Sequence, residues 1–330
     1  MIVTTTNSFF VFCFTPFSLA DKLDIHKLAF QVKASLVSDE NARKMLSGKN
    51  FVSSGKIINH TVMTEYHEHS KMLQANFRNM TLRDKGRGDR RGTESVAEEK
   101  FSIAFQSDIV VRISTNYEFT VSAHTLSLPI VVISHGKQEA NAAATIFWDN
   151  AFADENRLPY QVPERITWAR FVEALDYKWQ HELRSKIGLT KESKAYLASK
   201  IFGRFIPDHF EMCWRQLNRD TLPGYTFTFW QWFYAVMELC KSRHVQPHWN
   251  QAAIVGFIGK QECQRQLMSC DAGTFMMRFS DSKLGGISIA YYIIKDGRKE
   301  IAHLEPDTIK ILQVRSLADM IKDFDNLRRF

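Results

Sequence analysis

An arginine and two serines lie close together near the end of the chain, in the segment GTFMMRFSDS at residues 273–282. Side chains alternate between the two faces of a strand, so Arg278 and Ser280 are expected to project from one face. An arginine in such an apolar segment is costly to bury without an anionic partner. Its planar guanidinium suits two oxygens of a phosphate, and Ser280, Ser282 and the backbone N–H groups of the next turn can donate to the others. The spacing therefore predicts an anion site.

Lys260 supports this interpretation. It is expected in the first turn of the helix before the strand, where the positive end of the helix dipole disfavours a cation, and a bound anion would remove that conflict. The alternative is structural: a surface lysine on a frayed helix, and an Arg278 paired with Asp281 or a more distant glutamate. Residue chemistry by itself leaves both interpretations open.

The last eighty residues contain the elements that would position these side chains. The pattern predicts a helix around KQECQRQLM, strands at GTFMMRFS, ISIAYYII and EIAHLEP with turns at DSKLGG and DGR, and a final helix at SLADMIKDFDNLRRF. Helix, antiparallel strands and helix in this order predict a compact α+β unit.

The rest of the chain divides by its hydrophobic period. Short alternating runs over residues 28–146 predict an antiparallel β-sandwich or barrel, with one helix at DENARKMLSG that Ser38 caps and Gly48 ends. Over residues 168–243, apolar residues recur three and four apart, which predicts helices. Gly188 is expected to end one of these helices, and Thr190 to cap the next.

Composition narrows the class of protein. The chain has 330 residues, 45% of them hydrophobic, which predicts two or three globular domains. The net charge of +7 is spread along the chain, and its densest basic cluster is a loop at residues 83–91. The apolar run in the first twenty residues is too short to span a bilayer, and no other apolar stretch is long enough. Five scattered cysteines fit a reducing compartment.

The first twenty residues also raise the alternative of a secreted β-rich protein. The apolar run Phe9 to Phe14 lacks the basic residues that normally precede it in a secretory signal. Secretion would require cleavage near Ala20 and a glycan on Asn59; Asn79 is the second glycosylation-type sequon.

Other residue patterns are explained more simply by structure. Cys240, His244 and His248 recur every four residues, but Pro247 interrupts the helix, so no metal site is expected. Outward alternation on an exposed strand accounts for Glu65, His67 and His69. An aromatic block is expected to pack against its neighbours rather than stack on bases: Phe229, Trp230, Trp232, Phe233 and Trp249. We expect no catalytic residues, no cofactor and no enzyme activity.

The chain resembles the signal transducer and activator of transcription (STAT) family, on long motifs that occur in order over residues 22–330. They are FRNMTLRDKGRGDRRGTESVAEEKF, SLPIVVISHGKQEANAAATIFWDNAF, GLTKESKAYLASKIF, YTFTFWQWFYAVMELCKSRHVQPHWN, GTFMMRFSDSKLGGISIAYY and RSLADMIKDF. The similarity is strongest to the cytokine-responsive branch, which has a histidine after Val-Val-Ile-Ser.

The resemblance implies a multidomain fold: a non-family segment at 1–21, an all-β immunoglobulin-like (p53-like) DNA-binding domain at 22–158, an all-α linker domain at 159–248 and an α+β SH2 domain at 249–330. It implies a transcription factor in cytokine and receptor tyrosine kinase (JAK-STAT) signalling, found in cytoplasm and nucleus. Its expected partners are double-stranded DNA, phosphotyrosine-containing receptor or STAT peptides, and full-length family members in homo- or heterodimers.

The resemblance also assigns roles to individual residues. The phosphotyrosine-binding residues would be Arg278, Lys260, Ser280 and Ser282, with Asp281 shaping the turn and His303 either at the pocket edge or simply packed. The DNA-binding residues would be His135, which reaches base edges, Arg90 and Arg91, which neutralise phosphates, and Lys22, whose preceding residues depart from the family.

The family's usual N-terminal helical domain, coiled coil and tail tyrosine are not found in the sequence. Tyr291 and Tyr292, the tyrosines after residue 250, both fall within a strand. We therefore expect no reciprocal dimer of this chain with itself, and weak binding to a single half-site. The alternative function is a truncated non-activating form, or an adaptor that binds phosphotyrosine peptides without regulating DNA.

Overall fold

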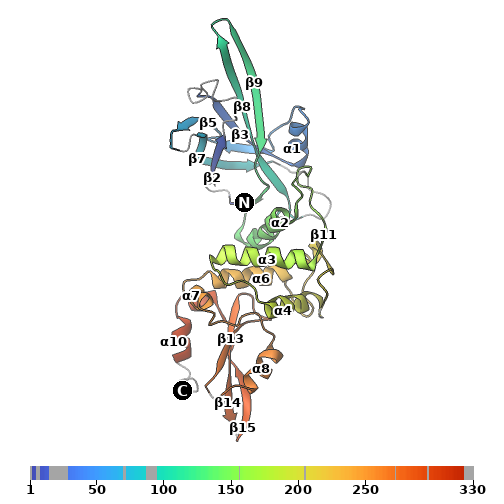
Figure 1. Ribbon diagram of the computed structural model, residues 1–330, viewed down its shortest axis with the longest axis vertical. Coiled ribbons are helices and arrows are strands. Elements are labelled where there is room, and N and C mark those ends of the chain that lie inside the picture. Colours follow the sequence, from blue (N-terminus) through green and yellow to red (C-terminus); the bar gives the residue numbers. More distant parts are fainter. Residues whose placement is uncertain are drawn as a thin grey trace. The chain divides into compact units, whose positions relative to one another are not determined.

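The computed structural model describes residues 2–4, 8–14, 29–69, 72–86, 95–155, 157–203, 206–271, 273–295 and 297–322, with backbone only for the first two ranges. The chain forms two compact units, Met1–Val162 and Pro163–Phe330, and each is described by itself. Figure 1 labels many of the elements of each unit. Within the described residues, no helix combines the length and apolar character needed to cross a bilayer.

Two sheets build the first unit. One has the strand order β1 (Ile2–Thr4), β10 (Ile130–Ile133), β8 (Lys100–Ser114), β3 (Gln31–Val37) and β5 (Thr61–Met63), with β9 (Tyr117–Leu126) also paired to β8. The other has the order β2 (Ser8–Phe14), β7 (Met72–Lys85) and β4 (Gly55–Ile58), with β6 (Glu65–His67) also paired to β7. The described pairs are antiparallel except β1 with β10.

Alternating residues of both sheets make one apolar core. Val32 and Leu36 of β3, Phe77 of β7 and Phe101 and Phe105 of β8 are all at most 5% exposed in a common cluster. Alternation places such residues on one face of each strand, so two inner faces meet. The predicted antiparallel sandwich is confirmed. Strand β6 is exposed along its length, as predicted for Glu65 and His67, but His69 lies in the turn after it.

The first unit has one predicted helix and one unexpected helix. Helix α1 (Asp39–Leu46) begins after Ser38 and is followed by Gly48 at φ 67°, as predicted, but the Ser38 side chain makes no capping hydrogen bond. The unexpected helix is α2 (Glu139–Phe152), which follows a short 3-10 turn, η3 (Gly136–Gln138). Most residues of α2 from Ala142 onward are buried on every side, so its sequence lacks the polar face that a periodicity argument needs.

The second unit begins with helices. They are α3 (Trp168–Leu183), α4 (Lys191–Phe202), α5 (Trp214–Asn218), α6 (Phe229–Cys240) and α7 (Gln246–Asn250), with a small ladder of β11 (Arg165–Thr167) and β12 (Glu211–Cys213). Thr190 caps α4 by accepting from the Ser193 amide, as predicted. The prediction for Gly188 was wrong: α3 ends at Leu183, because Arg184 takes the left-handed conformation at φ 48°.

Aromatic side chains fill the centre of these helices. Trp230 and Trp232 of α6 are fully buried, and the Trp179 ring of α3 packs 5.0 Å from Phe257 and 6.2 Å from Phe279. The predicted packing role of the aromatic block is confirmed. The same contacts join the helices to the sheet that follows.

The last part of the second unit is a sheet with helices beside it. Strands β13 (Phe275–Phe279), β14 (Gly286–Lys295) and β15 (Arg298–His303) pair in that order, antiparallel, and β16 (Asp307–Thr308) also pairs with β14. Helix α8 (Lys260–Met268) precedes them, and α9 (Ile309–Leu312) and α10 (Leu317–Lys322) follow. The predicted α+β unit is confirmed, and Figure 1 shows α8 beside the sheet.

Candidate functional site

Arg278 lies on β13 with its guanidinium buried. Its side chain is 8% exposed, and Nη1 donates to the carbonyl oxygens of Ile258 and Phe279, each at 3.2 Å. The edge of β13 is held by Gly256, whose carbonyl accepts from the Phe279 amide at 2.8 Å. Gly256 has φ 73°, and a Cβ there would stand 2.6 Å from the Phe279 ring, so only glycine fits this close approach.

The turn after β13 carries the two predicted serines. Ser280 is 2% exposed, and its Oγ accepts from the amides of Ser282 at 3.3 Å and Lys283 at 3.1 Å. Ser280 therefore shapes the turn with its hydroxyl oxygen. Ser282 is exposed at the start of the turn. Arg278 thus lies on the strand, whereas Ser280 and Ser282 lie in the turn that follows it.

Lys260 is the first residue of α8, as expected, and it is exposed. Its helix begins after Gly259, which has no side chain to accept from the first amides. The amide groups of this turn and the lysine together favour an anion.

Asp281 binds Arg278, and this pairing is what the structural alternative predicted. Its Oδ2 lies 3.0 Å from Nη1 of Arg278. The other oxygen, Oδ1, accepts from Nζ of Lys200 at 2.8 Å and from the Tyr196 hydroxyl. Burial alone would raise the pKa of Asp281, but the nearby Lys200 charge and these hydrogen bonds hold it below the usual range. The carboxylate therefore stays ionised between two cations.

Lys200 is as deeply placed as the arginine, with a side chain 6% exposed. Its ammonium lies 4.4 Å from the centre of the Trp232 ring, and Nε1 of Trp232 donates to the Ser280 carbonyl at 2.7 Å. Burial lowers the pKa of Lys200 despite the attraction of Asp281. Two buried cations therefore share one carboxylate, and these three side chains carry a net charge of +1.

Buried nitrogen atoms without a hydrogen-bond partner lie at and near the arginine. Nε of Arg278 and both ring nitrogens of His303 are buried without a hydrogen-bond partner among the described residues. Arg278 pairs with Ser288, and Ala290 with His303, so all four residues lie on one face of the sheet. Burial, and then the charges of Lys260 and Arg278, lower the pKa of His303.

A pocket of about 830 Å³ lies between residues of α4 and the start of α8. Its lining includes Tyr196 of α4 and Ile258, Gly259 and Lys260 at the start of α8. Thus the residues that border the buried charges also border open space.

The two residues of α4 are the part of the site that sequence reasoning missed. Tyr196 and Lys200 are one helical turn apart, which signals a shared face. The local sequence does not predict that they bind Asp281, which lies 85 and 81 residues away along the chain.

Of the four predicted DNA-binding residues, the structure describes His135 alone. Lys22, Arg90 and Arg91 lie outside the described residues. His135 is exposed between β10 and η3, where its backbone amide and that of Ser134 donate to the Gln138 side chain at 3.4 and 3.0 Å. The loop thus presents His135 to solvent.

The prediction of a basic loop was wrong at its start, because residues 83–85 are the end of strand β7. Lys85 of the cluster at residues 83–91 bonds to Glu99 at 2.5 Å and lies 5.0 Å from the centre of the Phe101 ring. Arg83 remains exposed.

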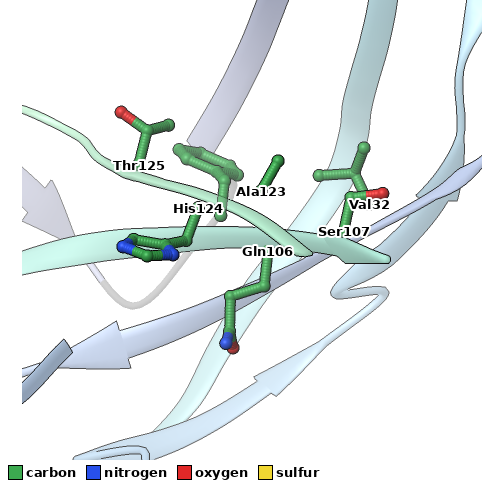
Figure 2. Close-up of a pocket in the computed structure, with 7 residues that line it drawn as sticks. Val32, Gln106, Ser107, Ala123, His124 and Thr125 are labelled. Carbon is green, nitrogen blue, oxygen red and sulfur yellow. The ribbon is translucent and has the colours of Figure 1, made fainter. Parts of the chain in front are cut away.

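Neither a small cavity in the first unit nor the cysteine–histidine pattern makes a second site. Figure 2 shows the cavity, which Val32, Gln106, Ser107, Ala123, His124 and Thr125 line with Phe105. At about 50 Å³ it holds little more than water. Across the described ranges, no group of three metal-ligating side chains is found, and Cys240 is fully buried.

Comparison with known proteins gives matches along most of the chain. Residues 15–133 match the family model "STAT protein, DNA binding domain", residues 155–233 match "Signal transducer and activator of transcription, linker domain", and residues 254–324 match "SH2 domain". The human protein "Signal transducer and activator of transcription 6" is 39% identical over 307 residues, which are 90% of this chain and 36% of that protein. The chain therefore spans about a third of the length of this relative.

Proposed function

Because the chain belongs to the signal transducer and activator of transcription family, we propose that it binds phosphotyrosine through Arg278 and DNA through its β-rich unit, as the core of a sequence-specific transcription factor. Its three parts are a DNA-binding domain at 22–158, a linker domain at 159–248 and an SH2 domain at 249–330. No catalytic reaction is part of this function.

The observation that carries the proposal is the buried charge around Arg278. Two cations with side chains at most 8% exposed share one carboxylate, and Nε of Arg278 has no partner in the described part of the chain. Burying a charge without compensation is costly, and a phosphate dianion would supply the missing negative charge. We propose Lys260, Ser280 and Ser282 as the further ligands.

The ion pair with Asp281 does not neutralise the charge around Arg278. If Arg278 and Asp281 were an isolated pair, the arginine would be neutralised and the structural alternative would suffice. Lys200 shares the same carboxylate at 2.8 Å, so the pair is only part of a cationic cluster. An anion can then bind without leaving any carboxylate unpaired.

For the DNA-binding function we propose His135 as a base-edge contact and Arg90, Arg91 and Lys22 as phosphate contacts. The proposed partners are double-stranded DNA, phosphotyrosine peptides of receptors or family members, and family members in dimers. Such a protein would act in cytoplasm and nucleus.

The deciding experiment measures binding of N-acetyl-O-phosphotyrosine amide to the 330-residue chain by calorimetry. Arg278→Ala should abolish measurable binding, because charge-assisted hydrogen bonds worth about 1.5–3 kcal/mol each are lost. The matched control is Arg265→Ala, which removes an exposed arginine of α8 that pairs with Glu262. Equal affinity of the Arg278→Ala protein and the parent would refute the site.

A further inference from the structure

The face of α4 that meets the sheet is tied to the phosphate-binding turn by charge and not only by packing. Tyr196 and Lys200 both reach Oδ1 of Asp281, while Arg278 takes Oδ2. The family matches place α4 in the linker domain and Asp281 in the SH2 domain. One carboxylate thus connects the two.

We propose that Lys200 and Tyr196 are positioning residues for phosphotyrosine capture, which hold Asp281 while Arg278 turns from that carboxylate to the phosphate. The inference rests on the proposed function of Arg278. It assigns the linker helix a direct part in setting phosphotyrosine affinity.

The charge balance explains why Lys200 is needed. When a phosphate binds Arg278, the phosphate and Asp281 compete for the single positive charge of the guanidinium. Without Lys200, the carboxylate would keep Arg278 as its one cationic partner and would also repel the dianion. With Lys200 at 2.8 Å, the carboxylate remains compensated after Arg278 has turned away.

Three aromatic rings hold the Lys200 ammonium beside Asp281. Its ammonium lies 4.4 Å from the centre of the Trp232 ring, 5.2 Å from that of Tyr225 and 5.8 Å from that of Tyr196. Aromatic faces stabilise a desolvated ammonium and limit its movement. Lys200 therefore stays with Asp281 and is not itself a phosphate ligand.

Tyr196 contributes an uncharged hydrogen-bond donor to the same cluster. Its hydroxyl donates to Asp281. Burial and then the Asp281 charge raise the pKa of Tyr196, so it keeps its proton and remains a donor. It fixes the orientation of the carboxylate without adding charge.

The test compares binding of N-acetyl-O-phosphotyrosine amide to variants of the whole chain by calorimetry. Lys200→Met should weaken binding by about tenfold, the size of one lost charge-assisted interaction, and Lys200→Arg should restore it to within about threefold. The matched control is Lys194→Met, on the same helix, whose ammonium pairs with Asp176 at 2.9 Å. Tyr196→Phe, which removes one hydroxyl, should weaken binding by about threefold even if Lys200→Met proves unstable.

A double-mutant cycle with Asp281→Asn separates positioning from general charge. If Lys200 acts through Asp281, its loss should cost less than about threefold once Asp281 is neutral. The same tenfold loss in both backgrounds, or parent affinity for both Lys200→Met and Tyr196→Phe, would overturn the inference. A parent chain that does not bind the probe would instead overturn the proposed function, and this inference with it.

Discussion

The carboxylate of Asp281 lies 3.0 Å from the guanidinium of Arg278, three residues back along the chain. An isolated pair of this kind would make the arginine a structural residue. Here Lys200 of α4 binds the other carboxylate oxygen, so Arg278, Asp281 and Lys200 together keep a positive charge. The arginine is thereby held in place and still able to attract an anion.

Asp281→Asn should make the free protein less stable and its response to phosphate larger. The substitution leaves two buried cations facing an amide, at a cost of about 3 kcal/mol, or somewhat less because the Asp281 side chain is 25% exposed. Thermal unfolding with and without N-acetyl-O-phosphotyrosine amide measures both effects. Asp220→Asn, in an exposed pair with Arg215, is the control and should change little. An unaltered melting temperature for Asp281→Asn would contradict the charge argument.

Trp232→Phe should destabilise the second unit more than Trp179→Phe does. Both indoles are fully buried, but Nε1 of Trp232 donates to the Ser280 carbonyl whereas Nε1 of Trp179 has no partner among the described residues. The two substitutions remove the same volume, so the difference reports the lost hydrogen bond, at about 1–3 kcal/mol for an orphaned buried carbonyl, together with the weaker contact of Lys200 with a phenyl ring. Urea unfolding measures it. Equal losses would show that this bond contributes nothing.

The stability of the second unit should fall as the pH drops below about 6.5 in the absence of phosphate. The pKa of His303 in the folded protein is lowered from its ordinary value of 6.5 by burial and by Lys260 and Arg278. In the window below 6.5 the unfolded chain takes up a proton that the folded chain does not, so acid favours unfolding. Urea unfolding at pH 7.5 and 5.5 tests this.

His303→Asn should reduce the loss of stability between those two pH values. His209→Asn, which changes an exposed histidine of the same unit, should leave the loss unchanged. If the His303→Asn protein shows the full pH dependence of the parent, another group is responsible.

Asp149→Asn should destabilise the first unit by about 3–5 kcal/mol. Asp149 is 1% exposed and accepts from Lys100 at 2.7 Å and Arg157 at 2.6 Å, so its loss leaves two poorly solvated cations. Guanidinium unfolding followed by circular dichroism measures the change. Glu118→Gln removes the exposed pair with Arg112 and should cost less than about 1 kcal/mol. A similar small loss for both variants would contradict a structural role for Asp149.

Arg90→Glu combined with Arg91→Glu should weaken binding to all DNA duplexes alike and lower the salt dependence of binding by about two counterions. His135→Ala should instead change the preference among base pairs. Electrophoretic shift titrations over a salt series, on duplexes that differ at one position, measure both. A loss confined to one base pair in the arginine variant would refute phosphate contact, and no sequence preference at any salt would favour an adaptor.

Local patterns were enough to predict most elements. Alternation predicted the sandwich and the three strands of the α+β part, and Thr190 and Ser38 marked where helices begin. The prediction failed where side chains do not alternate between solvent and core, as in α2, which is buried on nearly every side. It also failed at Gly188, because Arg184 accepted the left-handed conformation four residues earlier.

The sequence alone determined that Arg278, Ser280 and Ser282 fall within five positions at the end of a strand, and the predicted phosphate site rests on that spacing. Only the tertiary structure decided the charge around them. Lys200 and Tyr196 bind Asp281 although more than eighty residues separate them from it along the chain. Packing of the buried aromatic rings determines which face of α4 meets the turn. Periodicity specifies the face that an element buries, whereas the partner on the other side depends on how the whole chain packs.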